Sequence, residues 1–391
     1  MKILFVIDTF ETNNNGTSIS AQRYAAELRR RGHEVRILAT GDSDTIDYKL
    51  PEYTIPVFQP LVNKHGFQFA AVDKQVIASA ISWADVVHCF MPFGMEMYTA
   101  KTAIKQGIPC TGAFHIQPEN IWSSVGLGKI SWIQDLTYRI SNRIYYRRFK
   151  HIHVPSKFMG RMLAERKYKS KIHVISNGIQ NDFIEAGKRK AAKQEEPVDS
   201  NKKEVLKVMM IGRLAREKRQ DVIINAIKFS KYADKIQLVF AGRGPLYEKY
   251  VELGKQLKNP PQFIYVGRDE LIQHLLSTDL YIHASDMESE AISCIEAFAT
   301  GLVPVIANSD LSATPQFALD GRSLFIPGNP KDLARAMDYW FDHPREKQYM
   351  EELYRQSARK YTLKNCVAQF EEMLEEELAD HQEKPKKRSK K

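Results

Sequence analysis

Residues 286–301 have the sequence DMESEAISCIEAFATG, and the rest of the chain is organised around them. They follow the apolar run Leu280-Tyr281-Ile282-His283, which is typical of a buried strand. Ser285 or Asp286 can cap a helix after this strand, and Gly301 can end it. The predicted helix has an apolar face at helical spacing, formed by Ile292, Ile295, Phe298 and Ala299.

Two glutamates of this stretch, Glu288 and Glu296, are separated by seven residues. In a helix they would lie roughly 12 Å apart along the axis. A glycosidase pair is about 5–9.5 Å apart, so these two carboxylates are not expected to share one reacting bond. Two carboxylates at this distance can bind hydroxyl groups at the two ends of a ligand, and the start of the helix attracts a phosphate between them. A nucleotide sugar has this shape. The alternative is structural, because the helix dipole alone favours acidic residues in the first turn.

Composition limits the class of protein. The 391 residues are enough for two domains with separate cores. No apolar run approaches the length of a membrane span, and Asp8 cuts off the apolar run near the start, so no signal peptide is expected. The four cysteines lack the spacing of a metal site or a disulfide framework, which favours a reduced, cytoplasmic location. Much of the net charge of +10 comes from the closing segment 384–391, which is disordered by composition.

The spacing Glu-x7-Glu, followed by Ala-Phe-Ala-Thr-Gly-Leu-Val-Pro-Val, resembles the signature of the retaining glycosyltransferases of family 4. The resemblance implies the GT-B fold, an α/β fold with two Rossmann-like domains facing a cleft and a C-terminal helix crossing back to the first domain. The first domain would hold the acceptor and the second the nucleotide sugar. Members of the family need no metal and no other cofactor. Glu288 would orient the donor sugar hydroxyls, and Glu296 would hold the ribose.

Other motifs of the family follow in chain order. An apolar strand at 2–7 leads into a loop with Gly16, and helical spacing then continues to Gly32. The loop lacks the G-x-G-x-x-G pattern, which disfavours a nicotinamide dehydrogenase. The resemblance implies that Gly16 meets the donor diphosphate, although a lone glycine often marks only a turn.

His115 is the next candidate, at the carboxyl end of a predicted parallel strand, where open α/β sheets bind ligands. A lone histidine can also fill a polar gap in a core. The resemblance implies that His115 approaches the donor sugar and phosphate. The polar residues beside it, Gln117, Glu119 and Asn120, are candidates for contact with the acceptor.

Gly212-Arg213-Leu214 follows a predicted strand, and Lys218 comes shortly after, as in the family. Two cations at a strand end can neutralise a diphosphate, and each charge-assisted hydrogen bond contributes about 1.5–3 kcal/mol. Arg213 and Lys218 would stabilise the negative charge that builds on the leaving group. Exposed basic loop residues are the alternative. The sequence departs from the family at Glu290, where an aromatic residue is common.

The segment 129–150 has the pattern of an amphipathic helix with an apolar stripe, Ile133, Leu136, Ile140 and Ile144. Arg139, Arg143 and Arg147 recur at a spacing of four residues. Two interpretations are open. The helix can lie on an anionic membrane, or it can pack its stripe in the core of the first domain with a solvated basic face.

These patterns divide the chain into five segments. We expect an acceptor domain at 1–186, a linker at 187–204, a nucleotide-sugar domain at 205–362, a terminal helix at 363–381 and a basic tail at 382–391. The D-x-D sequence at 42–44 is interpreted as a solvated loop, so no metal ligands are predicted.

The resemblance implies hexose transfer from a nucleotide sugar, such as UDP-glucose, with His115, Arg213, Lys218 and Glu288 as catalytic residues. The basic helix and tail favour a membrane lipid acceptor such as diacylglycerol, and a peripheral position on the inner face of the cell membrane. The alternative acceptor is a polysaccharide or a lipid-linked glycan. A nucleotide-sugar epimerase and a non-catalytic binding protein are further alternatives. A nucleic-acid partner is not expected, because no recognition motif occurs.

Overall fold

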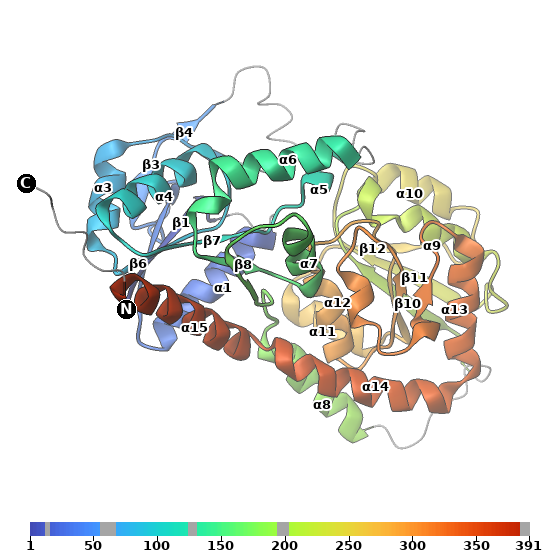
Figure 1. The fold of residues 1–391 in the computed structure, drawn as a ribbon. Helices are drawn as coiled ribbons and strands as arrows, with labels where there is room; N and C mark the ends of the chain where they lie inside the picture. Colours follow the sequence, from blue (N-terminus) through green and yellow to red (C-terminus); the bar gives the residue numbers. More distant parts are fainter. Residues whose placement is uncertain (12–15, 55–67, 124–130, 194–202, 384–391) are drawn as a thin grey trace, which may run out of the picture. The chain divides into compact units, whose positions relative to one another are not determined.

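The chain forms two compact units in a computed structural model that describes residues 1–11, 16–54, 68–123, 131–193 and 203–383 (Figure 1). Unit 1 comprises Met1–Gly178 and Leu363–Lys391, and unit 2 comprises Ile179–Thr362. Each unit has its own parallel sheet, which confirms the prediction of two Rossmann-like domains. The cleft expected between them stays a prediction.

Unit 1 is built on a seven-stranded sheet in the order β3-β2-β1-β6-β7-β8-β9, in which every neighbouring pair is parallel. The first strand in the chain, β1, is buried along almost its whole length, as expected for a strand covered on both faces. The order of the sheet reverses between β1 and β6. The strands are β1 (Lys2–Thr9), β2 (Glu34–Thr40), β3 (Tyr48–Leu50), β6 (Val86–Cys89), β7 (Cys110–Ala113), β8 (His151–Val154) and β9 (Lys171–Val174), with a separate antiparallel pair of β4 (Glu52–Tyr53) and β5 (Phe69–Ala70).

Helices alternate with these strands, as the right-handed crossovers of a parallel sheet require. They are α1 (Gly16–Arg30), α3 (Lys74–Trp83), α4 (Gly94–Gln106), α5 (Pro118–Ser123), α6 (Ser131–Ile144), the short η1 (Tyr146–Arg148), α7 (Lys157–Glu165) and α15 (Leu363–Gln382).

The last helix, α15, follows unit 2 in the chain but packs in unit 1 (Figure 1, dark red). Its apolar face, which includes Val367, Phe370 and Leu374, joins the core around β1 and α1. Its polar face adds ion pairs, such as that of Glu371 with Arg31 at 2.6 Å. The predicted return of the terminal helix to the first domain is therefore confirmed.

Unit 2 contains a six-stranded parallel sheet in the order β12-β11-β10-β13-β14-β15, which reverses between β10 and β13. This is the strand order of the doubly wound fold. The strands are β10 (Leu206–Ile211), β11 (Ile236–Ala241), β12 (Gln262–Ile264), β13 (Leu280–His283), β14 (Pro304–Ala307) and β15 (Leu324–Phe325). The helices are α8 (Asn181–Lys193), η3 (Arg216–Lys218), α9 (Gln220–Ile227), α10 (Tyr247–Gly254), α11 (Arg268–Leu276), α12 (Ile292–Ala299), η4 (Thr314–Phe317), η5 (Gly321–Ser323), α13 (Pro330–Asp342), α14 (Pro344–Ala358) and η6 (Arg359–Tyr361).

The boundary between the units lies earlier than the sequence predicts. Unit 2 begins at Ile179, and the predicted linker at 187–204 starts inside α8. Gly187 explains why: a Cβ atom there would lie 2.1 Å from the carbonyl oxygen of Ala299, so this part of α8 packs directly on α12. Of the predicted tail, residues 384–391 lie outside the described residues. Among the described helices, none has a long enough apolar stretch to pass through a bilayer.

Candidate active site

Two loops of unit 2 meet where the strand order of its sheet reverses. Residues 212–219 follow β10, and residues 284–288 follow the neighbouring strand β13. Hydrogen bonds join the loops: the Asp286 N–H donates to the Glu217 carbonyl at 2.8 Å, and Arg219 Nη1 donates to Asp286 Oδ2 at 2.9 Å. Open α/β sheets bind ligands at this kind of position, beyond the carboxyl ends of the strands.

Lys218, Glu288 and His283 form a charged cluster at this edge. Lys218 Nζ donates a hydrogen bond to Glu288 Oε1. His283 Nε2 lies 3.0 Å from the same oxygen, and its Nδ1 lies 3.2 Å from the hydroxyl of Tyr281. A carboxylate can only accept a hydrogen bond, so Nε2 of His283 donates to Glu288. Both bonds to Glu288 therefore use one of its two oxygens.

The charge of Glu288 is set by these neighbours. Burial alone would raise the pKa of this carboxyl, but the Lys218 ammonium and the His283 imidazole outweigh burial and hold the pKa well below its usual range. Because the pKa is lower in the folded than in the unfolded chain, the pair stabilises the fold above about pH 4.3, the usual glutamate value. That contribution is lost as the pH falls toward the folded-state pKa. Glu288 is thus a fixed carboxylate at neutral pH.

His283 was not among the candidates predicted from the sequence. It ends β13, and its side chain is fully buried against Glu288. The signal that singled out His115, a histidine at the carboxyl end of a parallel strand, applies equally to His283.

Arg213 lies on the same loop as Lys218 but has a different partner. Its Nη2 donates to Glu217 Oε1 at 2.9 Å, and its side chain is partly exposed. The loop is held by a close backbone approach, because a Cβ atom on Gly242 would lie 2.2 Å from the Gly212 carbonyl oxygen. The structure therefore brings Lys218 to Glu288. Arg213 is paired instead with Glu217 of its own loop, and a diphosphate would have to displace this carboxylate.

The helix that carries Glu296 starts later than the sequence predicts. Helix α12 begins at Ile292, so neither Ser285 nor Asp286 caps it, and Glu288 lies in the preceding loop. The cap position is Ala291, whose backbone is left-handed with φ 74°. A left-handed alanine costs about 1–2 kcal/mol, and such strain is concentrated at functional sites. The axial separation of roughly 12 Å, which assumed one continuous helix, does not apply. Glu296 is buried in α12.

Unit 1 holds the remaining donor candidates. Gly16 is the first residue of α1 and is exposed, and a Cβ atom there would meet nothing within 4 Å. His115 follows β7 and is buried, and its Nε2 makes no hydrogen bond within the described part of the chain. Burial and, to a smaller degree, the neighbouring His153 lower the pKa of His115 well below its usual value. His115 is therefore neutral at pH 7 and suited to bond a sugar hydroxyl rather than to neutralise phosphate charge.

Two of the three acceptor candidates next to His115 are less open than expected. Gln117 and Glu119 are buried, and Glu119 accepts a hydrogen bond of 3.0 Å from the hydroxyl of Tyr138 on α6. Asn120 lies in the short helix α5. Contact of these residues with an acceptor stays a prediction.

Helix α6 presents an apolar stripe to solvent. Along one line of the helix, the exposed fractions are 66% for Trp132, 45% for Leu136, 49% for Ile140 and 44% for Ile144. The buried side is held instead by Tyr138, which packs parallel to Phe114 with ring centroids 5.8 Å apart. The interpretation of this stripe as a core-facing surface is therefore wrong, apart from the partly buried Ile133. Arg139 and Arg143 on α6 and Arg147 on η1 are also exposed.

Comparison with known families divides the chain as the structure does. The family described as "Glycosyltransferase Family 4" matches residues 14–183, and the family described as "Glycosyl transferases group 1" matches residues 190–359. Most of each structural unit is thus covered by one family.

Individual relatives are distant. An alpha-monoglucosyldiacylglycerol synthase of Streptococcus pneumoniae is 24% identical over 79% of this chain and 71% of its own length. A GDP-mannose-dependent alpha-mannosyltransferase of Corynebacterium glutamicum is 23% identical over 78% of this chain and 72% of its own length. Among solved structures, HepE of Anabaena, in complex with UDP and glucose, superposes with a TM-score of 0.68 at 15% identity, covering 96% of this chain and 100% of that one.

Proposed function

This chain belongs to the glycosyltransferases of the GT-B type, and we propose that it transfers a hexose from a nucleotide sugar, UDP-glucose, to a membrane lipid such as diacylglycerol. The observation that carries the proposal is the exposed face of α6, where an apolar stripe runs beside a row of arginines. The relative from S. pneumoniae, a synthase of monoglucosyldiacylglycerol, supports the same acceptor class.

The two cations that follow β10 are the reason for proposing a nucleotide diphosphate sugar as the donor. As the bond between the anomeric carbon and the diphosphate breaks, negative charge accumulates on the leaving oxygen. Lys218, already fixed by Glu288, and Arg213, on the same loop, would neutralise that charge without a metal ion. UDP is the favoured nucleotide because HepE, with the same fold, binds UDP and glucose. The GDP-mannose-dependent relative makes GDP-mannose the main competing donor.

The proposed reaction retains the anomeric configuration. The acceptor hydroxyl oxygen forms a bond to the anomeric carbon on the face that the diphosphate leaves, and its proton passes to the departing diphosphate oxygen. Glu288 is not the nucleophile in this scheme, because Lys218 and His283 hold it as a stabilised carboxylate. Its second oxygen would instead accept a hydrogen bond from a sugar hydroxyl. Neutral His115 would bond the sugar as well, Glu296 would hold the ribose, and Gly16, at the start of α1, would offer its N–H to the diphosphate.

The acceptor proposal follows from the chemistry of α6. An amphipathic helix with exposed aromatic and aliphatic residues and a basic flank binds the interface of an anionic bilayer. Each arginine near such a surface contributes about 1 kcal/mol. We therefore place the protein peripherally on the inner face of the cell membrane. From there it would reach a lipid acceptor without a spanning helix.

A donor and acceptor screen tests the reaction directly. The purified chain is incubated with radiolabelled UDP-glucose or GDP-mannose and one of three acceptors: diacylglycerol vesicles, soluble glycan or water alone. Label that moves from UDP-glucose into the lipid extract is the expected result. Label in glycan would favour the polysaccharide or lipid-linked glycan transferase, and interconversion of the free nucleotide sugar would favour an epimerase. Absence of any transfer, with nucleotide binding retained, would favour a binding protein.

Membrane binding gives a second prediction. Reversing Arg139 and Arg143 to glutamate should weaken partitioning onto vesicles rich in phosphatidylglycerol by about 30-fold or more, since each lost arginine removes about 1 kcal/mol. Co-sedimentation with vesicles of known composition measures the partition coefficient. Wild-type binding should fall with added salt and with neutral lipid.

The matched control reverses Lys101 and Lys105, which are also four residues apart and exposed on a helix of unit 1, α4. This variant changes the net charge by the same amount but leaves α6 intact. If both double variants lose binding equally, general charge rather than the α6 face attracts the protein to the membrane. Equal sedimentation of the wild type with neutral vesicles would also count against the proposal.

A further inference from the structure

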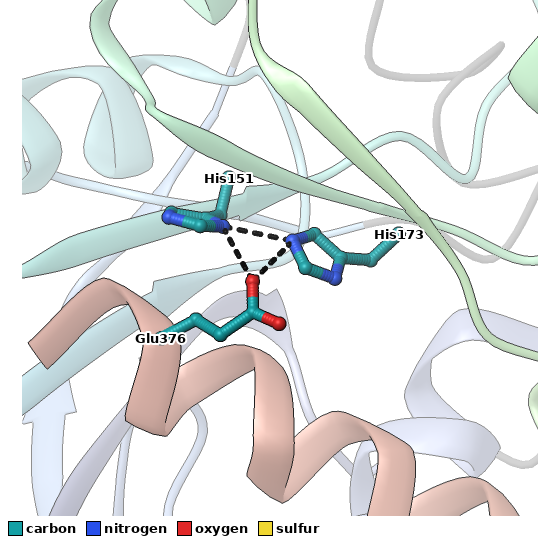
Figure 2. Close-up of side chains that lie close together, drawn as sticks. All are labelled: His151, His173 and Glu376. Atoms are coloured by element: carbon teal, nitrogen blue, oxygen red, sulfur yellow. Dashed lines mark hydrogen bonds and ion pairs between the residues drawn. The ribbon is translucent and has the colours of Figure 1, made fainter. Parts of the chain in front are cut away.

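A second group of polar side chains lies in unit 1, where α15 packs on the edge of the sheet. His151 is the first residue of β8, and His173 lies on the adjacent strand β9. Glu376 comes from α15, more than 200 residues later in the chain. Figure 2 shows the two imidazoles and the carboxylate pointing toward one another. Within the described residues, this is the one group of three or more histidine, cysteine or acidic side chains with ligand atoms close enough to share a metal ion.

The distances between the ligand atoms suit a small divalent ion. His151 Nδ1 lies 2.8 Å from His173 Nε2, and Glu376 Oε2 lies 3.9 Å from the first and 3.8 Å from the second. Zinc binds histidine nitrogen and carboxylate oxygen at about 2.0–2.2 Å in a tetrahedral arrangement. In that arrangement the ligand atoms are roughly 3.3–3.5 Å apart. Small side-chain shifts would therefore place all three atoms around one ion.

The surroundings of His151 favour metal binding. Its other nitrogen, Nε2, lies 3.3 Å from Asp380 Oδ2, and Lys150 Nζ holds the same carboxylate oxygen at 3.1 Å. A carboxylate that accepts the Nε2 proton leaves Nδ1 unprotonated and facing the other two ligands, which is the usual arrangement around metal-binding histidines. His151 is 3% exposed and Glu376 45% exposed, so the site is anchored in the fold and open to solvent on one side.

Two contacts compete with a metal. The hydrogen bond of 2.8 Å between His151 Nδ1 and His173 Nε2 holds a proton between the two nitrogens that would bind the ion, so this proton leaves when the metal binds. Lys171 Nζ donates a hydrogen bond to Glu376 Oε2, the same oxygen that would bind the ion. The lysine side chain is largely exposed, so it can turn into solvent at little cost when a metal takes its place.

We propose that His151, His173 and Glu376 bind a zinc ion that fastens α15 to strands β8 and β9 of unit 1. The ligands N, N and O fill three positions of a tetrahedron, and water would fill the fourth. Three protein ligands and a water are the usual set of a catalytic zinc, but the position of this site in the sheet assigns it a structural role. His151 begins its strand, whereas ligands of open α/β sheets bind beyond the carboxyl ends. The ion would stabilise the helix by which the chain returns to unit 1, and the sugar transfer itself would remain independent of metal.

The test uses the full-length chain without a polyhistidine tag, stripped with a chelator and dialysed. Calorimetric titration with zinc sulfate should give one site per chain with a Kd in the micromolar range or tighter, and the Tm should rise on zinc addition, because the metal binds only the folded arrangement. Cobalt in place of zinc should give the visible absorption of a tetrahedral ion. His173→Gln should abolish the site, and Asp380→Ala should weaken it by about 10-fold or more through the loss of the proton acceptor.

His33→Gln is the matched control. His33 Nε2 also bonds a carboxylate of α15, Glu371 Oε1 at 2.6 Å, but it is not one of the proposed ligands. This variant should bind zinc like the wild type. If His173→Gln does not fold, Glu376→Gln, changed at an exposed side chain, replaces it. Zinc binding that survives both His173→Gln and Glu376→Gln, or a Tm that zinc leaves unchanged in the wild type, would overturn the proposal.

Discussion

Replacing Lys218 with methionine should lower kcat for sugar transfer by about 100- to 1,000-fold, the usual effect of removing one donor that stabilises developing negative charge. The ammonium group is the only part of the side chain lost, because methionine has a similar length. Lys218 would act on the leaving diphosphate, so the effect should be in kcat more than in the donor KM. Steady-state rates with UDP-glucose, or with whichever donor the screen identifies, measure it.

The same substitution should also affect Glu288. Without Lys218, His283 is the one close side-chain donor that the carboxylate keeps among the described residues, and a buried charge with too few partners is costly. The thermal unfolding curve of the variant is therefore measured together with its kinetics. Lys231→Met is the matched control, since Lys231 also pairs with a carboxylate of unit 2, Asp342, but on the surface, in the segment that precedes β11 rather than after the carboxyl end of a strand. It should leave kcat unchanged.

A small change in kcat for Lys218→Met, with the fold intact, would contradict the assignment. It would leave Arg213 as the main cation at the diphosphate and reduce Lys218 to a structural partner of Glu288. A loss of folding alone is recognised by the unfolding curve and is therefore distinguishable from a catalytic defect.

The fold could be predicted from local patterns because each strand of a parallel sheet carries its own signal. The run Lys2-Ile3-Leu4-Phe5-Val6-Ile7, for example, is buried on both faces and needs no partner to be recognised. The start of α12 could not be predicted in the same way. Asp286 has the residue type of a helix cap, but its carboxylate is taken by Arg219, and the helix starts only after the left-handed Ala291. Alanine gives no sequence signal for that conformation.

Side-chain partners depend on contacts between distant segments, and the sequence does not contain them directly. The spacing of Glu288 and Glu296 was recognisable, whereas the bond of Glu288 to Lys218 joins two loops that follow different strands. The stripe of α6 was likewise recognisable as apolar. Periodicity shows that a helix has two faces but not which one is buried, and here Tyr138 rather than Leu136 faces the core. The group around His151 depends on the register of β8 and β9 and on the return of α15.

Glu296→Ala should raise the donor KM by about 10- to 100-fold and change kcat much less. The expectation follows from the role assigned to the carboxylate, which is to hold the ribose hydroxyls of the nucleotide. A hydrogen bond to a charged group contributes about 1.5–3 kcal/mol, and each 1.4 kcal/mol is a factor of ten in affinity. The ribose does not change during the reaction, so its contacts are equally strong in the ground state and the transition state and appear in KM. Binding of UDP alone, measured by calorimetry, should weaken by the same factor.

Glu351→Ala separates this effect from the general cost of losing a buried carboxylate. Glu351 is buried on α14 and pairs with Lys347 at 3.2 Å, but it lies on none of the loops that follow β10 or β13. Both alanine variants should lose stability, and only Glu296→Ala should lose donor affinity. If UDP binds Glu296→Ala as tightly as the wild type, the ribose contact must be assigned to another residue, and the Glu-x7-Glu spacing would retain only Glu288 as a functional member.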